Sequence, residues 1–324
     1  KLAILAAITH DECRPLERNF NSLQKALFMA NHDLYQEVTN TFIALLEQDG
    51  IQAWRKAWKN ISSSPINIIT GTQYRGWNWF SLTLAAGPRP NQWATFKQVQ
   101  SQNGHIRKGS AGVKIGFYTP REKHESGDEQ TSDEVLAEKS HRFIFRIYHV
   151  FNALDIEGIT VPSPVPFEGN SIQSLMTVCL AKLKKDGLVY KRVGNKAAYW
   201  PKQDIITMPE GSFDSPQDYC AILAHEMTHA TESRLGRREK INDWFPDFDD
   251  SYAFEELVAE LGAAFICAHF NIKGDYDNHA SYLHSWLKML KGDKFTLYRA
   301  VKLAQEAADW LLDQQVAPAL QEAA

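Results

Sequence analysis

The sequence predicts an α+β protein of two domains, a small basic α+β domain followed by a mainly helical one. Its length of 324 residues exceeds that of a usual single domain. Residues 51–121 combine tryptophan, basic side chains and frequent glycine, a composition typical of short strands and tight turns. After residue 215, apolar residues recur at helical spacings around the pentapeptide His225-Glu-Met-Thr-His229. We expect four segments: an N-terminal extension of unknown role (1–32), the basic domain (33–160), a proline-rich linker (161–168) and the helical domain (169–324).

The overall composition is that of an ordinary soluble protein, with 44% hydrophobic and 23% charged residues. No apolar run approaches the roughly 18 residues that a membrane span needs. The short apolar run Leu2–Ile8 is followed by charged residues rather than by a cleavage site. The four cysteines, at positions 13, 179, 220 and 267, form no C-x-x-C pair, so we interpret them as reduced core residues. We therefore expect a cytoplasmic protein with no membrane partner.

The basic domain begins with an amphipathic helix, predicted over Asp33–Gln48 from apolar residues at spacings of three and four. Next comes a block, Ile51–Arg121, that contains no Asp or Glu, although the whole chain has a net charge of −4. The natural partner of such a positively charged block is a polyphosphate. The block contains ten basic side chains: Arg55, Lys56, Lys59, Arg75, Arg89, Lys97, Arg107, Lys108, Lys114 and Arg121.

Tryptophans interleaved with these basic residues indicate single-stranded DNA as the partner, with duplex DNA bound more weakly. Basic groups follow a nucleic-acid backbone, while flat rings stack on bases that are not paired in a duplex. No helix-turn-helix or zinc-finger spacing is present. The side chains that we expect to contact DNA are Trp54, Trp58, Arg75, Trp77, Trp79, Trp93, Lys97, Arg107, Lys108 and Lys114.

Each tryptophan also has a purely structural interpretation. Trp77 and Trp79 are two residues apart in a predicted strand, so their rings share one face, which is either core or a stacking platform. The same two alternatives apply to Trp54, Trp58 and Trp93.

Three elements complete the basic domain. The acidic, Ser- and Gly-containing segment 124–140 predicts an exposed loop. The β-prone run Arg142–Phe151 after it predicts a strand. Val161–Pro166 carries three prolines and marks the domain boundary.

The helical domain begins with a predicted helix over Ser171–Lys185 and a short β-prone run, Ala198–Pro209. A proline near the start of this run confines it to a sheet edge, where an extended peptide can pair with it. An ordinary edge strand without a binding role fits the run equally well. Two amphipathic segments, Tyr282–Leu290 and Phe295–Asp313, follow near the C-terminus.

The H-E-x-x-H pentapeptide lies on a predicted helix with clear boundaries. Ser215 is a suitable N-cap, Pro216 fits the first helical position, and Gly236 fits the C-terminal end. His225 and His229 are four apart, so one helix face presents both imidazoles to a single ion at roughly 2.0–2.1 Å. The alternative is a surface helix with two solvated histidines.

Glu226 lies next to the first histidine and is our candidate catalytic residue, since it can take a proton from a metal-bound water. We expect one catalytic-type Zn²⁺, with another divalent metal such as Mn²⁺ as an alternative.

A second apolar helix, predicted over Tyr252–Ile266, supplies acids for the same site. Glu256 and Glu260 are four apart and share a face, and buried acids require a cation or a hydrogen-bonded histidine. We assign Glu256 as the third metal ligand and Glu260 as the acceptor for a ligand histidine's N–H. We interpret Glu255 as a solvated surface acid. Tyr252, one turn before Glu256, is a candidate electrophile.

Two sets of motifs occur in order along the chain. The N-terminal motifs are Asp33-Leu-Tyr-Gln-Glu-Val, Tyr74-Arg-Gly-Trp-Asn78, Trp93-Ala-Thr-Phe-Lys97, Arg107-Lys-Gly and Val150-Phe-Asn152. The C-terminal motifs are Tyr199-x-Pro-x-x-Asp204, His225-Glu-Met-Thr-His229 and Tyr252-Ala-x-Glu-Glu-Leu-Val-Ala-Glu260.

In these motifs the chain resembles plasmid antirestriction proteins of the ArdC type, in which a single-stranded-DNA-binding domain precedes a zincin-like metallopeptidase domain. The resemblance runs from about residue 33 to near the C-terminus, but does not extend to residues 1–32. It implies a protein that binds incoming single strands during conjugation and protects plasmid DNA from host restriction endonucleases.

Three functional hypotheses follow. The first is a DNA-binding antirestriction protein whose metal domain is structural, regulatory or a protease of narrow scope. The second is a DNA-guided zinc protease that cleaves DNA-bound proteins, its substrate being unknown. The third is a generic peptidase whose basic domain recruits acidic substrates.

Overall fold

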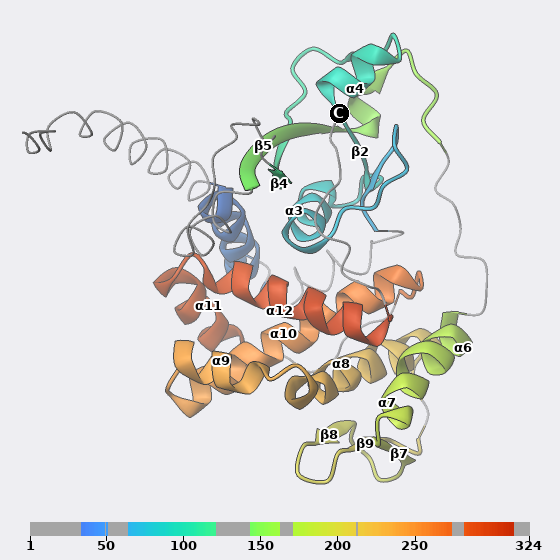
Figure 1. Cartoon of the computed structure of the whole chain (residues 1–324), viewed down its shortest axis with the longest axis vertical. Helices are drawn as coiled ribbons and strands as arrows, with labels where there is room; N and C mark the ends of the chain where they lie inside the picture. The colour runs from blue at the N-terminus through green and yellow to red at the C-terminus, as the bar shows by residue number, and fades with distance from the viewer. Residues whose placement is uncertain are drawn as a thin grey trace, which may run out of the picture.

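The computed structural model describes residues 34–48, 50, 64–120, 143–162, 171–211, 213–273 and 282–313. The expectations for residues 1–32, Trp54, Trp58 and the acidic loop 124–140 lie outside the described residues. Figure 1 places a sheet-containing region at one end and a group of helices, α6 to α12, at the other. A helix over residues 34–48 contributes to the core, in agreement with the predicted amphipathic helix. The α+β class is confirmed.

The sheet of the first region has four strands in the order β1-β2-β5-β4. β1 (Ile66–Asn67) is parallel to β2 (Gln92–Thr95), which pairs antiparallel with β5 (Phe143–Asn152). β5 pairs along its length with β4 (Val113–Pro120), from Val113 opposite Val150 to Pro120 opposite Phe143. The strand predicted over Arg142–Phe151 is therefore confirmed as β5.

Helix α3 (Gly76–Ala86) corrects one prediction, because it contains Trp77 and Trp79, which we expected in a strand. The two-residue spacing suggested alternation, but the surrounding apolar residues also recur at spacings of three. The helix lies between the sheet and the helices of the second region (Figure 1). Leu82 packs toward the sheet, while Trp77 and Trp79 pack toward the helices. Contact on both sides explains why α3 is apolar around most of its circumference.

The opposite face of the sheet is covered by helix α4 (Phe96–Ser101) and a small ribbon. The ribbon consists of β3 (His105–Ile106) and β6 (Ile156–Glu157), paired antiparallel. Ala94 of β2 and Val99 of α4 lie in this second apolar cluster. The central strand β2 is therefore buried on both faces.

The second region begins with a continuous helical stretch made of α6 (Ser171–Leu175), a π-helical segment (Met176–Leu180) and α7 (Ala181–Lys185). The sheet that follows has the order β7-β9-β8. β9 (Ile205–Met208) is central, between β7 (Val189–Arg192) and β8 (Ala198–Trp200).

The single edge strand predicted over Ala198–Pro209 is therefore a hairpin, of which only β8 lies at the edge. Residues 201–204 form the turn. Pro201 fixes its backbone φ and has no N–H to donate, so it favours a turn at this position over continuation of the ladder.

Five helices complete the region: α8 (Pro216–Arg234), α9 (Arg237–Trp244), α10 (Phe248–His269), α11 (Leu283–Gly292) and α12 (Thr296–Leu311). α12 packs against α10, α8 and also α3 of the first region. Trp79 contacts Phe265 of α10 with ring centroids 4.4 Å apart. The two regions thus share one hydrophobic core. Of the helices in the described ranges, none is long and apolar enough to cross a membrane.

Candidate metal centre

Helix α8 presents the two histidines of the H-E-x-x-H motif, and its boundaries are those predicted. The Ser215 hydroxyl accepts a hydrogen bond from the Asp218 N–H at 3.1 Å, and Pro216 occupies the first turn. Gly236 follows the helix with a φ of +56°, a left-handed conformation that a glycine adopts without strain. Local sequence therefore determines the helix that carries the candidate site.

Helix α10 crosses α8 closely, and a glycine makes this possible. A Cβ atom added at Gly262 would lie 2.5 Å from the Thr228 methyl carbon and 2.8 Å from its hydroxyl oxygen. Both residues belong to the packed interface between the two helices. The absence of a side chain at Gly262 allows α10 to bring its carboxylates against the histidines of α8.

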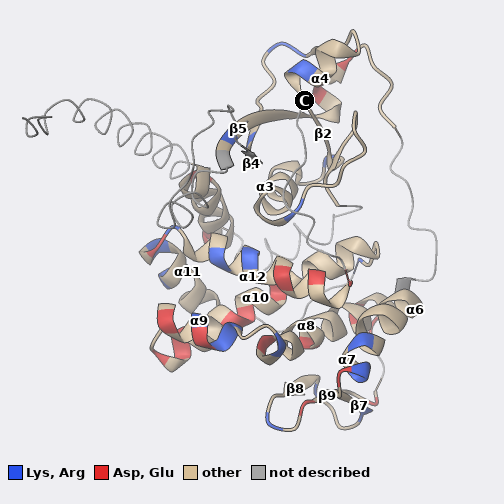
Figure 2. Ribbon diagram, viewed as in Figure 1, with Lys and Arg blue, Asp and Glu red and all other residues tan. Residues whose placement is uncertain are grey.

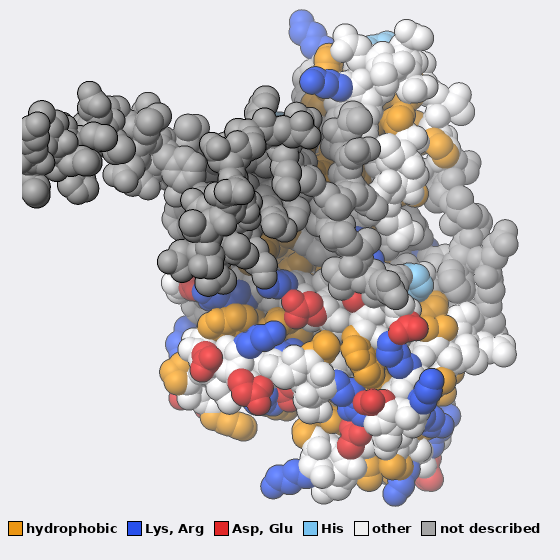
Figure 3. All heavy atoms as spheres, viewed as in Figure 1, with side chains coloured by type: hydrophobic (Ala, Val, Ile, Leu, Met, Phe, Trp, Pro, Cys, Tyr) orange, Lys and Arg blue, Asp and Glu red, His pale blue; other side chains and the backbone are white. Residues whose placement is uncertain are grey.

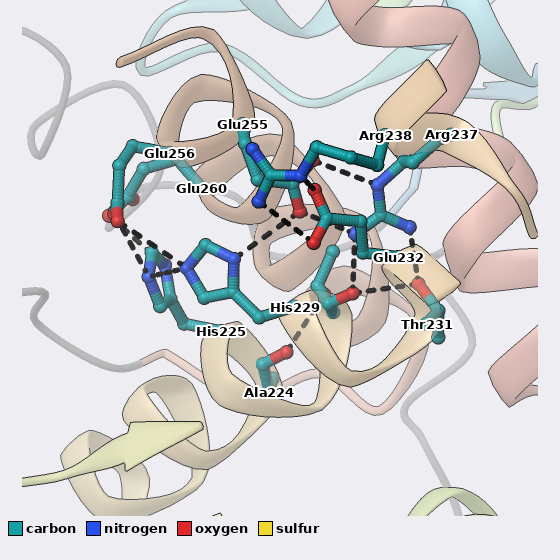
Figure 4. Close-up of polar contacts among 11 residues, drawn as sticks. Ala224, His225, His229, Thr231, Glu232, Arg237, Arg238, Glu255, Glu256 and Glu260 are labelled. Atoms are coloured by element: carbon teal, nitrogen blue, oxygen red, sulfur yellow. Dashed lines mark hydrogen bonds and ion pairs between the residues drawn. The ribbon is translucent and has the colours of Figure 1, made fainter. Parts of the chain in front are cut away.

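Three donor groups face one point between these helices (Figure 4). His225 Nε2 lies 3.0 Å from His229 Nε2, and Glu256 oxygens lie 3.5 and 3.7 Å from these two nitrogens. Ligands held at ~2.0–2.2 Å around a tetrahedral ion are separated by about 3.3 Å. Among the residues that the structure describes, His225, His229 and Glu256 form the group of possible metal ligands whose donor atoms all lie within 4.8 Å of one another. The residues therefore fit a metal ion.

The outward nitrogens of both histidines face carboxylates. His225 Nδ1 lies 3.4 Å from Glu260 Oε1, where we expected an acceptor. His229 Nδ1 lies 3.3 Å from Glu255 Oε1. A carboxylate on Nδ1–H leaves Nε2 free to bind metal and fixes the orientation of the ring.

Glu255 corrects the expectation of a solvated surface acid, because its side chain is only 2% exposed. The guanidinium of Arg237, 1% exposed, donates from Nη2 at 2.6 Å and from Nε at 2.9 Å to the two carboxylate oxygens. Arg237 also donates to the Thr231 hydroxyl at 2.6 Å and to the Thr228 carbonyl at 2.7 Å. All three guanidinium nitrogens are thus satisfied, so the buried pair is held rigidly behind His229.

Each histidine of the site lies between two carboxylates, which favour the protonated, positively charged form of the ring. Burial lowers the pKa of both histidines, but hydrogen bonds to carboxylates outweigh it. The pKa of His225 rises well above 6.5 through Glu256 and Glu260, and that of His229 rises to about 9 through Glu255 and Glu256. A metal ion that binds here must therefore displace protons, so its affinity falls as the pH falls.

Glu226 lines a cavity of about 640 Å³ that opens beside the three donor groups. The walls include Tyr199 of the edge strand β8 and Tyr252, our candidate electrophile. Burial, followed by the charge of Glu256, raises the pKa of Tyr252 far above its ordinary value, so the phenol keeps its proton at any physiological pH. The cavity thus combines a carboxylate, a phenol and a strand edge next to the donor cluster.

The tryptophans predicted to contact DNA are buried where the structure describes them. Trp77 is 9% exposed, Trp79 3% and Trp93 1%, and all three belong to apolar clusters. Of the two alternatives, the structure therefore supports core packing for these rings. No base can stack on a ring whose faces contact other side chains.

The predicted basic residues are distributed differently. Arg75 forms an ion pair with Asp309 of α12, and Lys114 pairs with Glu37 at 2.5 Å. Arg107 pairs with Glu157 at 3.1 Å but stays 58% exposed. Lys97 and Lys108 are exposed.

Sequence reasoning missed Arg237 and the role of Glu255. Arg237 lies 18 residues before its partner and looked like one of two basic residues in a polar loop. The only sequence signal was the acid at position 255, directly before the expected ligand on an apolar helix. Which of the three glutamates of α10 faces a given histidine depends on how the two helices cross.

Two family models match this chain in succession. Residues 32–151 match the N-terminal domain of anti-restriction factor ArdC. Residues 181–303 match a zincin-like metallopeptidase domain.

Two crystal structures of the antirestriction ArdC protein from plasmid R388 are similar to most of this chain, across both matched domains. Each shares 32% sequence identity and is covered to 97% of its length. The metal-free form has a TM-score of 0.64 over 87% of this chain, and the Mn(II)-bound form has 0.66 over 86%.

Sequence relatives are also found, and the share of their length that this chain covers differs widely. The uncharacterized protein y4eC of Sinorhizobium fredii (strain NBRC 101917 / NGR234) is 32% identical over 292 residues, which are 87% of this chain and 92% of that protein. A DNA primase TraC of Escherichia coli is 30% identical over 290 residues. The present chain spans only 19% of that primase.

Proposed function

Because the chain belongs to the ArdC family of antirestriction proteins, we propose that it binds single-stranded DNA and protects incoming plasmid DNA from host restriction endonucleases during conjugation. This activity takes place in the cytoplasm of the recipient, where the entering strand and the restriction enzymes meet. The observation that carries the proposal is the acid-free block Ile51–Arg121 with its ten basic side chains. Such a field attracts a phosphate backbone.

Salt dependence tests this DNA contact. Lys97→Ala and Lys108→Ala should each lower the slope of log binding constant against log salt by about 0.7, the value for one phosphate of a single strand. Fluorescence anisotropy of a labelled oligonucleotide at several salt concentrations measures this slope. Lys202→Ala removes an exposed lysine of the second region and should leave the slope unchanged. An unchanged slope in both Lys97→Ala and Lys108→Ala would place the DNA elsewhere.

In the second region we propose a single metal site with His225, His229 and Glu256 as ligands and with Zn²⁺ or Mn²⁺ as the ion. When bound, the ion would act as a Lewis acid toward a water molecule and a carbonyl. Glu226 would serve as the proton acceptor for a water molecule at the site, and the protonated Tyr252 phenol would donate a hydrogen bond to a developing oxyanion. Glu255 and Glu260 keep the two imidazoles in their ligating orientation.

A second candidate function is a DNA-guided protease that cleaves DNA-bound proteins. The open cavity beside a complete donor set favours it, because the edge strand β8 lies in the cavity wall and can pair with an extended polypeptide. If the protein has this function, DNA binding by the basic region brings the metal site to proteins that are already bound to DNA.

Cleavage assays with Glu226→Gln separate the two functions. A panel of DNA-bound proteins, including a restriction endonuclease, is incubated with and without single-stranded DNA. For a protease, DNA-stimulated cleavage should be lost in Glu226→Gln while metal content is retained, because only the proton acceptor is removed. Absence of cleavage, with restriction still blocked by both proteins, would rule out the protease and support protection by binding alone.

A further inference from the structure

Burial of Trp77, Trp79 and Trp93 prevents these three rings from stacking on single-stranded DNA. The structure offers another ring. Phe96, the first residue of α4, is 53% exposed. Among the side chains described in residues 64–117 and 145–162, the exposed large hydrophobic ones are Phe96 and Leu154, and only Phe96 is aromatic. It lies within the acid-free block, directly before Lys97.

Phe96 lies in a helical turn that is held by hydrogen bonds of neighbouring residues, and about half of its side chain is exposed. The Thr95 hydroxyl accepts from the Gln98 N–H at 3.3 Å, and the Gln98 side chain accepts from the Thr95 N–H at 3.0 Å. The Gln98 side chain also accepts from the Asn67 amide at 2.9 Å, and Val99 is buried in the core of the region. The backbone at Phe96 is thus fixed, and its ring is available to an incoming planar group.

Basic residues lie on α4 and directly after the strand that packs against it. Lys97 is exposed beside Phe96, and β3, which packs against α4, leads directly to the exposed residues Arg107 and Lys108. We call Phe96, Lys97, Arg107 and Lys108 the α4 tip. Figure 2 shows Lys and Arg on α4 and on the loop that leads from it toward β4. In Figure 3 the same end carries basic side chains next to hydrophobic ones, while the acidic side chains of this face gather over the helices.

The acids near the α4 tip are already paired with cations. Asp155 pairs with Arg89 at 2.5 Å, and Glu157 pairs with Arg107 at 3.1 Å. Lys97 and Lys108 add two positive charges that these pairs do not neutralise. An exposed ring next to a lysine, in a region with further unpaired positive charge, matches a base flanked by its phosphates better than it matches an apolar protein surface.

We infer that Phe96 stacks on a base of single-stranded DNA and that Lys97 contacts the adjacent phosphate. The contact is made by the two side chains rather than by backbone amides of the short helix. This inference rests on the proposed DNA binding and names the residues that perform it. Because every base has a π-face, such a contact binds without sequence preference.

A comparison of two oligonucleotides isolates the stacking contact. Binding of the full-length protein to oligo-dT and to an abasic oligonucleotide of equal length is measured by fluorescence anisotropy. Phe96→Ala should weaken oligo-dT binding about tenfold, within the range for one aromatic–base stack. It should leave abasic binding and the salt slope unchanged, because no base and no charge is lost. Phe96→Trp should restore oligo-dT binding.

Phe248→Ala is the matched control, since it makes the same change at a phenylalanine of α10 that is 72% exposed. This variant should bind both oligonucleotides like the wild type. If the wild type binds oligo-dT and Phe96→Ala binds it equally well, the inference is wrong and the proposed DNA binding stands. An equal loss on both oligonucleotides would indicate a structural role and also overturn the inference. If the wild type binds neither, the proposed function itself fails.

Discussion

Replacing Arg237 with methionine is expected to lower the free energy of unfolding by about 3–5 kcal/mol, the typical cost of breaking a buried ion pair. Arg237 is 1% exposed, and its removal leaves the buried Glu255 carboxylate without its main cation. It also removes the donor to the Thr231 hydroxyl and one of the donors to the Thr228 carbonyl, which still accepts a hydrogen bond from the Thr231 hydroxyl. Urea or thermal unfolding of the metal-free protein measures the change.

The neighbouring residue provides the control. Arg238 pairs with Glu232 but is 37% exposed, so Arg238→Met should cost at most about 1 kcal/mol. Combining Arg237→Met with Glu255→Leu should recover much of the stability, because the unpaired buried charge is removed as well. Equal effects of Arg237→Met and Arg238→Met would contradict the burial described above.

The stabilisation from the Arg237–Glu255 pair should also depend on pH. Burial raises the pKa of Glu255, but the charge and hydrogen bonds of Arg237 outweigh it and lower that pKa to about 2. A carboxylate with a lowered folded pKa stabilises the fold above its unfolded pKa of about 4.3, and this contribution disappears as the pH falls toward 2. The stability difference between the wild type and Arg237→Met should therefore shrink below about pH 4.5.

Replacing His225 with alanine is expected to weaken metal binding by more than about 100-fold. Loss of a residue that only orients a ligand costs 10- to 100-fold in affinity, and His225 supplies a donor atom itself. Competition with a chromophoric chelator at fixed pH measures the affinity for Zn²⁺ and Mn²⁺. The variant should also lose metal-dependent thermal stabilisation, because ligand binding and folding are coupled.

Glu226→Gln is the matched comparison for this experiment. The residue lies next to His225 on the same helix but is not one of the three clustered donors. The affinity of the Glu226→Gln variant for metal should stay within a few-fold of the wild type, since glutamine has nearly the same shape as glutamate. Retention of Zn²⁺ by His225→Ala would show that the ligand assignment is wrong.

Local sequence alone determined the boundaries of α8 and which of its residues share a face. The Ser215 and Pro216 signals set its beginning, and the four-residue spacing of His225 and His229 places both rings on one face of any α-helix. The same argument placed Glu256 and Glu260 on one face of α10. These conclusions hold because hydrogen bonding within a helix fixes which residues share a face, whatever surrounds the helix.

Only the tertiary structure decided which of the predicted site residues are buried. Trp77 and Trp79 became core residues because α3 lies between the sheet and helices more than 170 residues away in sequence, with Phe265 among their contacts. Glu255 became a partner of His229 because α9 folds back and inserts Arg237 beside it. Composition could identify the basic block, but a tryptophan can serve equally well in a core or on a surface. Only the contacts between distant segments distinguish the two, and those contacts are not encoded in local spacing.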